Sequence, residues 1–405
     1  YIDKEFIFES ESERKLVIAV FIKSPDSFSK ANVNLLNTIS IPFIADTEDK
    51  SFFFFKNAVI EISSENIITR KLDELDGYIW EEDIIDFDFS FSDAKSIVPK
   101  GEFNSFISDL STHKDKKIND QNSDSLTTII GYLLSRSKNP ANPKAIVLMD
   151  TYKDGNPHGG TGKGLLSKAL KRIRNTAFID GKTHSSKDKF GLAHVSLGTK
   201  ILVYDDVPRD FKFEKIFPLV TEDAVVERKY ENKFTIPFED SPKILITTNY
   251  TVEGKGSSHR RRKVEFIISD TYDDEYTPED KFGHLIFLGW GDQEWQYFYE
   301  FMIHCVQMFL LMGIVEPKFN VRERALKMNA SLSFIDFAKE DLEVSNKYNK
   351  REVYEKFYTK FPDHYKIEQN TFTGWLKLYA DAKSLQLVES HSGSDNYFEF
   401  VINKI

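Results

Sequence analysis

The sequence predicts an α/β fold in which a parallel β-sheet, flanked by helices, carries a glycine-rich loop. Short apolar runs at 145–149, 201–203 and 244–246 are typical of buried parallel strands, and each leads into polar residues. The first run continues through the turn 158–163 into a segment with apolar residues at helical spacing, 165–173. Strand, glycine turn and helix in this order predict a loop that binds phosphate groups.

In such a loop, backbone N–H groups turn inward and the helix N-terminus adds positive potential where a phosphate would lie. Lys163 would reach the β- and γ-phosphates of a nucleotide. The usual pattern is G-x-x-x-x-G-K-[ST], but Pro157 replaces the first glycine and Gly164 replaces the hydroxyl residue that normally holds Mg²⁺. Glycine turns before helices also occur without nucleotides. The predicted nucleotide-binding residues are Gly159, Gly160, Thr161, Gly162, Lys163, Gly164 and Leu165.

The composition indicates a soluble globular protein with several domains, since 29% of its 405 residues are charged and 40% are apolar. No apolar run approaches the length of a bilayer span, and the N-terminus has no signal peptide. The single cysteine, Cys305, excludes an internal disulfide framework and suits a reducing cytoplasm. Because the chain begins at Tyr1 and not at Met, we expect it to be a piece of a larger protein.

The net charge of −10 is unevenly distributed along the chain. Residues 73–93 and 270–280 are rich in Asp and Glu, whereas residues 163–189 and 255–263 are basic. A ring with an acidic outer surface and a basic channel would have this profile.

We expect four regions. Residues 1–100 read as β-rich, with strands over LVIAVFI, SFFFFKNAVIEIS and YIWEEDIIDFDFSF. Residues 101–140 read as a helical collar, in which FNSFISDL and SLTTIIGYLLS are separated by the polar linker THKDKKINDQNSDS. Residues 141–320 hold the phosphate loop and its sheet. Residues 321–405 read as two helices followed by a two-stranded wing around Ser392–Ser394, which predicts a winged-helix-like α+β domain that binds either DNA or protein.

Polar side chains follow two more of the apolar strands. Asp205 and Asp206 end the run 201–203, and Asn249 follows the run 244–246. Because the carboxyl ends of parallel strands meet at one sheet edge, these side chains should lie beside the phosphate loop. Asp205 would hold Mg²⁺, Asp206 would polarise the attacking water and Asn249 would orient it. Paired aspartates at a strand end are otherwise often only the start of a turn.

Two basic groups complete the pattern, and we expect them at the same edge of the sheet. Residues 224–238 read as two alternating strands around Glu231–Asn232, with Arg228, Lys229 and Lys233 at the turn, where they would contact DNA phosphates. Arg260, Arg261 and Arg262 precede an apolar strand, and one of them would reach a neighbouring subunit's γ-phosphate as an arginine finger. An alternative interpretation is that both groups are only solvated surface charges.

Residues 125–315 resemble a superfamily 3 helicase, an AAA+ P-loop ATPase type of viruses, phages and mobile elements. The likeness is strongest to the helicase halves of phage and poxvirus-type primase-helicases. The motifs that carry it are IIGYLL, GGTGKG, ILVYDDV, TEDAVVERKY, SPKILITTNY, SSHRRRKVEF and the helical run after Phe282, with FFFFKNAVIEI and DGYIWEEDII before them.

The resemblance implies an ATP-dependent DNA helicase that uses ATP and Mg²⁺ and works as a ring, expected to be a hexamer, on single-stranded or forked DNA. It implies an upstream primase part in the same protein and a location in the cytoplasm of a bacterial host.

The resemblance also implies a role for each site residue. Lys163 would be the lysine of the phosphate loop, and Asn249 would be the sensor. Asp205 and Asp206 would be the acidic pair, with Asp206 where many relatives have Glu. Arg228, Lys229 and Lys233 would lie on the DNA-contacting hairpin, and Arg260 or Arg261 would be the finger. Gly164 and Asp206 keep a second interpretation open, a nucleotide-gated DNA-binding or loading ring with little hydrolysis. A third, a remodeller of protein partners, is disfavoured by the basic hairpin.

Overall fold

The computed structural model describes residues 10–23, 42–92, 99–153, 156–157, 160–183, 191–230, 232–250, 252, 261–318, 321–362, 364–393 and 395–402. The chain divides into two compact units. One comprises residues 1–44 with 76–79, and the other comprises residues 45–75 with 80–405.

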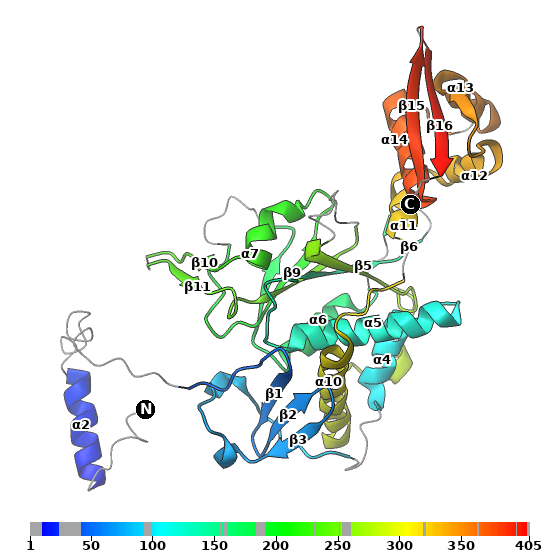
Figure 1. Cartoon of the computed structure of the whole chain (residues 1–405). Coiled ribbons are helices and arrows are strands. Elements are labelled where there is room, and N and C mark those ends of the chain that lie inside the picture. Colours follow the sequence, from blue (N-terminus) through cyan, green and yellow to red (C-terminus); the bar gives the residue numbers. More distant parts are fainter. Residues whose placement is uncertain are drawn as a thin grey trace. The chain divides into compact units, whose positions relative to one another are not determined.

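The described part of the first unit contains a helix, α2, over Glu11–Lys23 (Figure 1). The strand predicted over LVIAVFI is therefore wrong. The Ser10 hydroxyl caps the helix by accepting the Glu13 N–H at 3.2 Å. Acidic residues in the first turn and Lys23 in the last match the helix dipole. A short apolar run is compatible with either a strand or a helix. Here the terminal charges and the Ser10 cap favour the helix.

The second unit begins with a sheet in the order β3-β2-β1-β4. Its strands are β1 Lys50–Phe55, β2 Val59–Ser63, β3 Ile67–Arg70 and β4 Ile84–Ile85. The strands predicted over SFFFFKNAVIEIS are confirmed. The run YIWEEDIIDFDFSF contributes β4, a 3₁₀ turn at Glu81–Asp83 and an isolated β-bridge from Tyr78 to Phe43. Another 3₁₀ turn spans Leu72–Glu74. The side chain of Asp46 is fully buried just before β1, and it forms ion pairs with Arg136 and Arg174. Burial alone would raise the pKa of Asp46, but the charges of Arg174 and Arg136 outweigh it and hold that pKa below its usual value.

Three helices pack against one another: α4 Gly101–Ser111, α5 Lys116–Leu134 and α10 Asp292–Met312 (Figure 1). α10 also packs on β1 and β2, and all three helices share one core with this sheet. The predicted linker 112–125 is helical from Lys116 onward, because the Asp115 side chain accepts the N–H groups of Lys117 and Ile118 and caps α5. A Cβ at Gly131 would lie 2.0 Å from the carbonyl oxygen of Cys305, so this glycine allows the backbones of α5 and α10 to approach closely. Cys305 is buried at that contact.

The central sheet has five parallel strands in the order β13-β5-β12-β9-β8, which confirms the predicted parallel α/β core. The strands are β5 Ala145–Asp150, β8 Thr176–Asp180, β9 Ile201–Val207, β12 Lys243–Thr248 and β13 Lys263–Ile268. Alternate side chains of each strand point to opposite faces. Ile146 and Leu148 join the core shared with α4, α5, α10 and α6 (Lys163–Lys171), whereas Val147 and Met149 join a second core on the other face.

The second core is completed by a 3₁₀ turn at Phe213–Ile216, by α7 (Phe217–Thr221) and by the hairpin of β10 (Ala224–Val226) and β11 (Phe234–Ile236). The predicted hairpin is thus confirmed as two antiparallel strands, separate from the central sheet. Short elements near the phosphate loop are β6 Tyr152–Lys153, β7 Asn156–Pro157 and α9 Pro278–Phe282.

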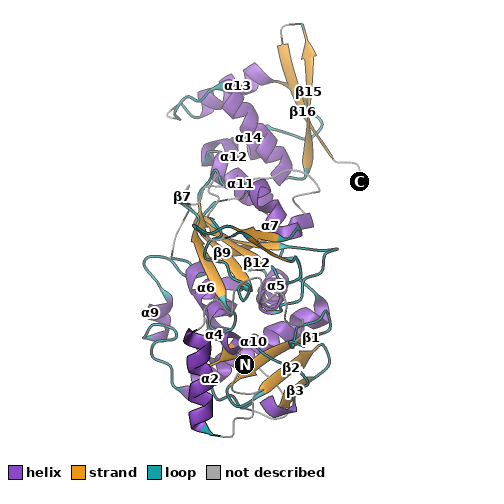
Figure 2. Cartoon of the chain, turned by 90° about the vertical axis from the view of Figure 1, so that its left-hand side faces the viewer, coloured by secondary structure: helices purple, strands orange, loops and turns teal. Residues whose placement is uncertain are grey.

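The C-terminal part, whose helices α11–α14 and hairpin β15–β16 are labelled in Figure 2, has its own core, which includes Phe334, Phe357 and Trp375. Its elements are α11 Val321–Asn329, α12 Leu332–Asp341, β14 Lys347–Asn349, α13 Lys350–Lys360, α14 Gln369–Ala382, β15 Leu385–Ser392 and β16 Asp395–Ile402. The expected order of two helices and a two-stranded wing is present as α13, α14 and the β15–β16 hairpin, onto which β14 adds a third strand. Its classification as a winged helix and its ligand stay predictions.

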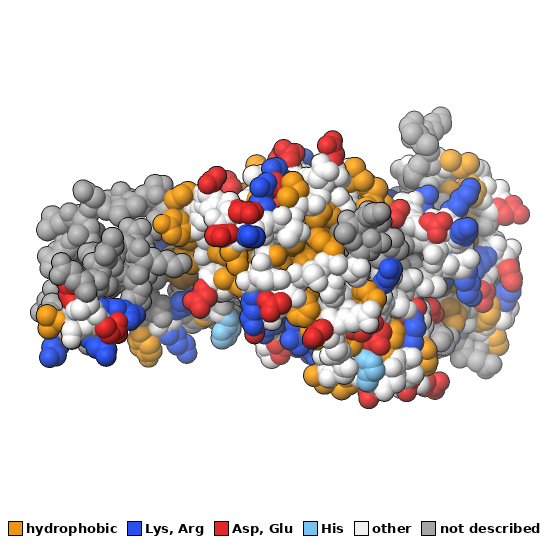
Figure 3. All heavy atoms as spheres, turned by 90° about the horizontal axis from the view of Figure 1, so that it is seen from below, with side chains coloured by type: hydrophobic (Ala, Val, Ile, Leu, Met, Phe, Trp, Pro, Cys, Tyr) orange, Lys and Arg blue, Asp and Glu red, His pale blue; other side chains and the backbone are white. Residues whose placement is uncertain are grey.

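On the face seen in Figure 3, acidic and basic side chains are interspersed, with hydrophobic side chains exposed between them. Within the described ranges, no helix combines the length and apolar character that crossing a bilayer requires.

Candidate nucleotide site

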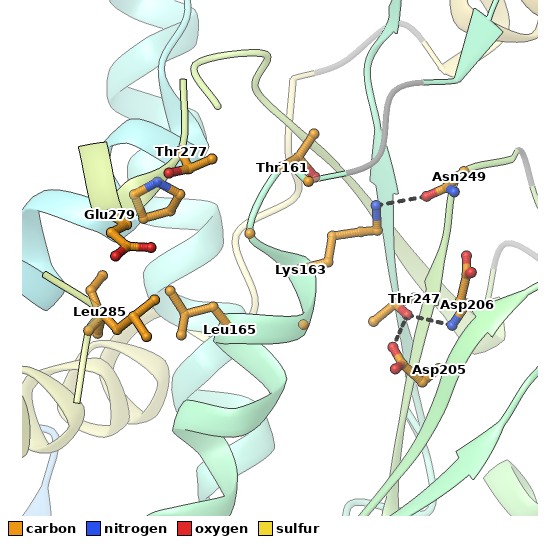
Figure 4. A pocket seen from close by; sticks show the side chains of 15 residues that line it. Thr161, Lys163, Leu165, Asp205, Asp206, Thr247, Asn249, Thr277, Glu279 and Leu285 are labelled. Atoms are coloured by element: carbon orange, nitrogen blue, oxygen red, sulfur yellow. Dashed lines mark hydrogen bonds between the residues drawn. The ribbon is translucent and has the colours of Figure 1, made fainter. Parts of the chain in front are cut away.

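A cavity of about 510 Å³ opens at the carboxyl ends of the central strands. Figure 4 shows the polar side chains of Lys163, Asn249 and the aspartates on one side, and Leu165, Glu279 and Leu285 on the other. The cavity is lined by residues 160–165, Asp205, Asp206, Thr247, Asn249, Thr277, Pro278, Glu279, Leu285 and Ile286. The predicted phosphate loop, acidic pair and asparagine are therefore brought together around one space.

The loop needs glycine at two of these positions. Gly160 and Gly162 have φ angles of +81° and +101°, in the left-handed region. A Cβ on Gly162 would also lie 2.8 Å from the ring of Phe106, so this loop packs directly on α4. Helix α6 begins at Lys163, which places its first N–H groups at the cavity. Gly159 lies outside the described residues.

Lys163 is nearly buried, and two side chains hold its ammonium group. Asn249 accepts from Nζ at 3.0 Å, and Asp150 forms an ion pair with it. The Thr161 hydroxyl donates to the other carboxylate oxygen of Asp150. Burial raises the pKa of the Asp150 carboxyl, although Lys163, Thr161 and Arg324 oppose that rise.

Asp205 and Asp206 both line the cavity, although neighbouring residues of a regular strand point to opposite faces. Two deviations make this possible. The pairing of β9 with β12 shifts register between Ile246 and Thr248, and Asp206 has a left-handed φ of +52°. Thr247 fixes the pair, since its hydroxyl donates to Asp205 Oδ1 at 2.6 Å and accepts the Asp206 N–H at 2.8 Å. Backbone strain of this kind is characteristic of functional sites.

The opposite wall of the cavity is largely apolar. Leu165, Pro278, Leu285 and Ile286 line it together with the carboxylate of Glu279. The segment that carries this wall is anchored to α4, because Tyr272 donates to the Asp109 carboxylate and Lys281 forms an ion pair with it. One end of the cavity thus offers charge and the other offers apolar surface.

The carboxylates of the cavity fit a magnesium ion that arrives with a nucleotide. Mg²⁺ is usually held by one or two carboxylates together with substrate phosphates and water. Across the described residues, no group of three or more His, Cys, Asp or Glu side chains could hold a metal ion. Asp205 and Asp206 supply carboxylates, whereas Gly164 supplies no hydroxyl.

The hairpin presents its predicted basic residues unequally. Lys229 and Lys233 are exposed near the turn, beside the fully exposed Tyr230. Arg228 is half-buried instead, and its guanidinium donates to the carbonyls of Ala193 and Val195 at 3.0 Å each. It also lies 5.3 Å from the ring centroid of Phe234. Arg228 therefore has a structural role in holding the hairpin to the loop beside it.

The arginines before β13 do not share the sheet edge of the phosphate loop, and the expectation that they would is wrong. β13 runs parallel to β5, with Lys263 opposite Ala145, so Arg261 and Arg262 lie at the amino ends of the strands. Arg262 packs 5.0 Å from the ring centroid of Phe217, whereas Arg261 is exposed. Arg260 lies outside the described residues. A finger role in a neighbouring chain stays a prediction.

Three contributions escaped the sequence interpretation: Asp150, Thr247 and the wall 277–286. Asp150 could have been found, because it is the one acidic residue in the apolar run AIVLMD. The role of Thr247 could not be predicted, since hydroxyl side chains at strand ends are common. The wall is separated from the loop by more than a hundred residues of sequence, and only packing brings it to the cavity.

Comparisons with known proteins give remote similarities. Residues 156–262 match the model of a family of unknown function, DUF5906. No curated protein matches the chain. The chain is similar to an apo structure of the NrS-1 C-terminal region, at 12% identity and a TM-score of 0.35, over 87% of this chain and 97% of that one.

Two further similar structures are of helicases. A JCV helicase has 11% identity and a TM-score of 0.30, over 68% of this chain and 64% of that one. The active helicase Cch of SCCmec type IV has 9% identity and a TM-score of 0.30, over 97% of this chain and 86% of that one.

Proposed function

We propose that this chain is the ATP-hydrolysing DNA helicase module of a phage or mobile-element replication protein, of the superfamily 3 AAA+ type. One observation carries the proposal. The loop lysine, the acidic pair and the strand-end asparagine lie at the carboxyl side of three adjacent strands, β5, β9 and β12, and line one cavity. This set matches the requirements of phosphoryl transfer to water, in which positioning and charge stabilisation supply most of the catalysis.

In this proposal each residue has a separate role. The backbone of residues 160–164 cradles the phosphates, and Lys163 neutralises charge on the β- and γ-phosphoryl oxygens. Asp205 would hold Mg²⁺, which would supply charge that neutralises the phosphate oxygens. Asp206 accepts a proton from the attacking water, which Asn249 orients.

The apolar wall supports a nucleoside triphosphate as the ligand rather than a simple phosphate. A nucleobase offers flat apolar surface, and Leu165, Pro278 and Leu285 could pack against it. The Glu279 carboxylate could accept a hydrogen bond from a ribose hydroxyl.

The rest of the mechanism requires more than one copy of the chain. In a ring, the exposed lysines of the hairpin would contact the phosphates of a single strand in the central channel. An arginine before β13, being far from its own cavity, would act on the cavity of a neighbour. A primase part upstream in the same protein belongs to the same proposal.

The deciding experiment is Mg²⁺-dependent ATP hydrolysis with and without single-stranded DNA, on this chain and on Lys163→Ala. We expect hydrolysis that rises with DNA and is lost in the variant. Hydrolysis that survives the substitution would show that the ATPase assignment is wrong.

A second candidate is a nucleotide-gated DNA-binding or loading ring with little turnover. The absent hydroxyl at Gly164 and the ion pair that occupies Lys163 favour it. Tight ATP binding that controls DNA affinity, without DNA-stimulated hydrolysis, would distinguish this ring from a motor.

A further inference from the structure

Arg324 of α11 reaches the two strands that bear the phosphate loop and the asparagine. Its Nε donates to the Asp150 carbonyl oxygen at 2.5 Å, and its Nη2 donates to the Asn249 carbonyl oxygen at 3.0 Å. The side chain is nearly buried and lies between Met149 and Met328, whose sulfurs are 3.8 and 3.2 Å from Nη1. One guanidinium therefore joins the ends of β5 and β12, which are neighbours in the sheet.

The same two residues hold Lys163 through their side chains. Asp150 forms its ion pair with Lys163 Nζ, and Asn249 accepts from that atom at 3.0 Å. Arg324 thus fixes the backbone of both groups that set the position of the loop lysine. A change in the separation of the two strand ends would therefore alter the contacts of both Lys163 and Arg324.

The charges at this site predict how nucleotide binding would affect Arg324. The Asp150 carboxylate is fully buried, so it needs a compensating cation. A bound triphosphate would draw the Lys163 ammonium toward its oxygens and leave Asp150 with less compensation. Arg324 is then the cation that remains beside Asp150, and its hold on this strand end should become stronger.

α11 belongs to the C-terminal core. Leu326 and Ala330 are buried in that core, and α11 packs along α14. We infer that Arg324 is a positioning residue that couples the C-terminal part to the nucleotide state of the cavity. The inference rests on the proposed nucleotide site, and it concerns a connection that the hydrolysis scheme does not need.

The test is hydrogen exchange of α11 in the full chain, with and without a non-hydrolysable ATP analogue. Binding is measured on the same samples by calorimetry. In the wild type we expect severalfold slower exchange over residues 321–329 when the analogue binds. Arg324→Met should abolish this change while the analogue still binds, because Met fills the space between the two methionines and donates no hydrogen bonds.

Two further variants make the result specific. Arg324→Lys keeps the charge but lacks the planar fork that serves both carbonyls, so it should lose most of the change, and it replaces the Met variant if that fails to fold. Arg322→Met removes an arginine of the same helix whose ion pair runs to Asp381 of α14, and it should behave as wild type.

The outcomes separate the two proposals. If the wild type binds the analogue and α11 exchange does not change, the coupling is wrong and the nucleotide site stands. The coupling is equally wrong if the Met and Lys variants keep the full change. If the wild type does not bind the analogue, the proposed function fails and the coupling fails with it.

Discussion

The Thr247 hydroxyl lies 2.6 Å from Oδ1 of Asp205 and donates to it. Because the Thr247 hydroxyl oxygen also accepts the Asp206 N–H, one side chain orients both members of the acidic pair. We expect Thr247→Val to lower ATP hydrolysis about tenfold or more, as for groups that orient metal-binding carboxylates. ATP affinity should stay near the wild-type value. Thr247→Ser, which keeps the hydroxyl, should restore most of the rate; equal rates in the Val and Ser variants would contradict this role.

Gly164 offers a direct test of the missing hydroxyl. A Cβ at this position meets nothing within 4 Å, so a serine fits without displacing its neighbours. We expect Gly164→Ser to increase Mg²⁺-dependent hydrolysis severalfold, because it supplies the Mg²⁺ ligand of the usual pattern. Gly164→Ala is the matched control. Both variants should gain up to about 1 kcal/mol of helix stability, but only the serine should change the Mg²⁺ dependence of the rate.

Leu285 tests the apolar wall. It is half-exposed in the cavity, and truncation to alanine should weaken ATP binding about fivefold, which corresponds to the loss of roughly 1 kcal/mol of apolar contact. Inorganic triphosphate, which has no base, should bind both proteins equally. Leu288→Ala is the control, since Leu288 is exposed on the same segment and does not line the cavity. If Leu285→Ala weakened the binding of ATP and of inorganic triphosphate equally, Leu285 would not contact the nucleoside.

The hairpin variants should separate DNA contact from folding. Lys229→Gln and Lys233→Gln should each weaken single-stranded DNA binding and reduce the slope of log K against log salt by about 0.7. Arg228→Gln should instead lower the unfolding temperature, because the Ala193 and Val195 carbonyls lose their donor. Lys71→Gln, at an exposed position beside β3, should change neither property. Unchanged salt slopes in both lysine variants would exclude the hairpin as a phosphate contact.

Lys138 predicts a pH dependence of stability. Burial lowers its pKa from 10.5 to about 8, and its ammonium donates to the Ser241 hydroxyl at 2.6 Å. Between pH 8 and 10.5 the unfolded chain binds more protons at this site than the folded chain, so its contribution to the unfolding free energy rises with pH. Below pH 8 the full cost, about 3 kcal/mol, is present. Denaturant titrations should therefore show Lys138→Met more stable than wild type at pH 7, with the difference shrinking by pH 10; a constant difference would contradict the shift.

The polar end of the cavity could be predicted because it follows from strand ends. Asp205, Asp206 and Asn249 follow apolar runs closely, and Lys163 follows another such run through the glycine loop. Parallel strands bring these positions to one edge. The same rule, applied to Arg261, failed because this residue precedes its strand and so lies at the other edge.

Other features depend on contacts that no local pattern encodes. Arg324 meets Asp150 across 174 positions of sequence. The left-handed conformation of Asp206 arises from the register shift opposite Thr247. The first half of α5 was missed because its polar composition is typical of a linker, and its helix depends on the Asp115 cap and on packing farther along.

The core on one face of the central sheet has a consequence for how the chain unfolds. It contains Phe53 and Ile60 of the N-terminal sheet, Phe106 of α4 and Leu166 of the phosphate-loop helix, all fully or almost fully buried. Residues that share one close-packed interior tend to lose their structure together. The phosphate loop should therefore melt in the same cooperative transition as strands that lie a hundred residues before it, and a damaged N-terminal sheet should abolish nucleotide binding without touching the cavity. The C-terminal part has a separate hydrophobic core, and we therefore expect it to unfold in a transition of its own.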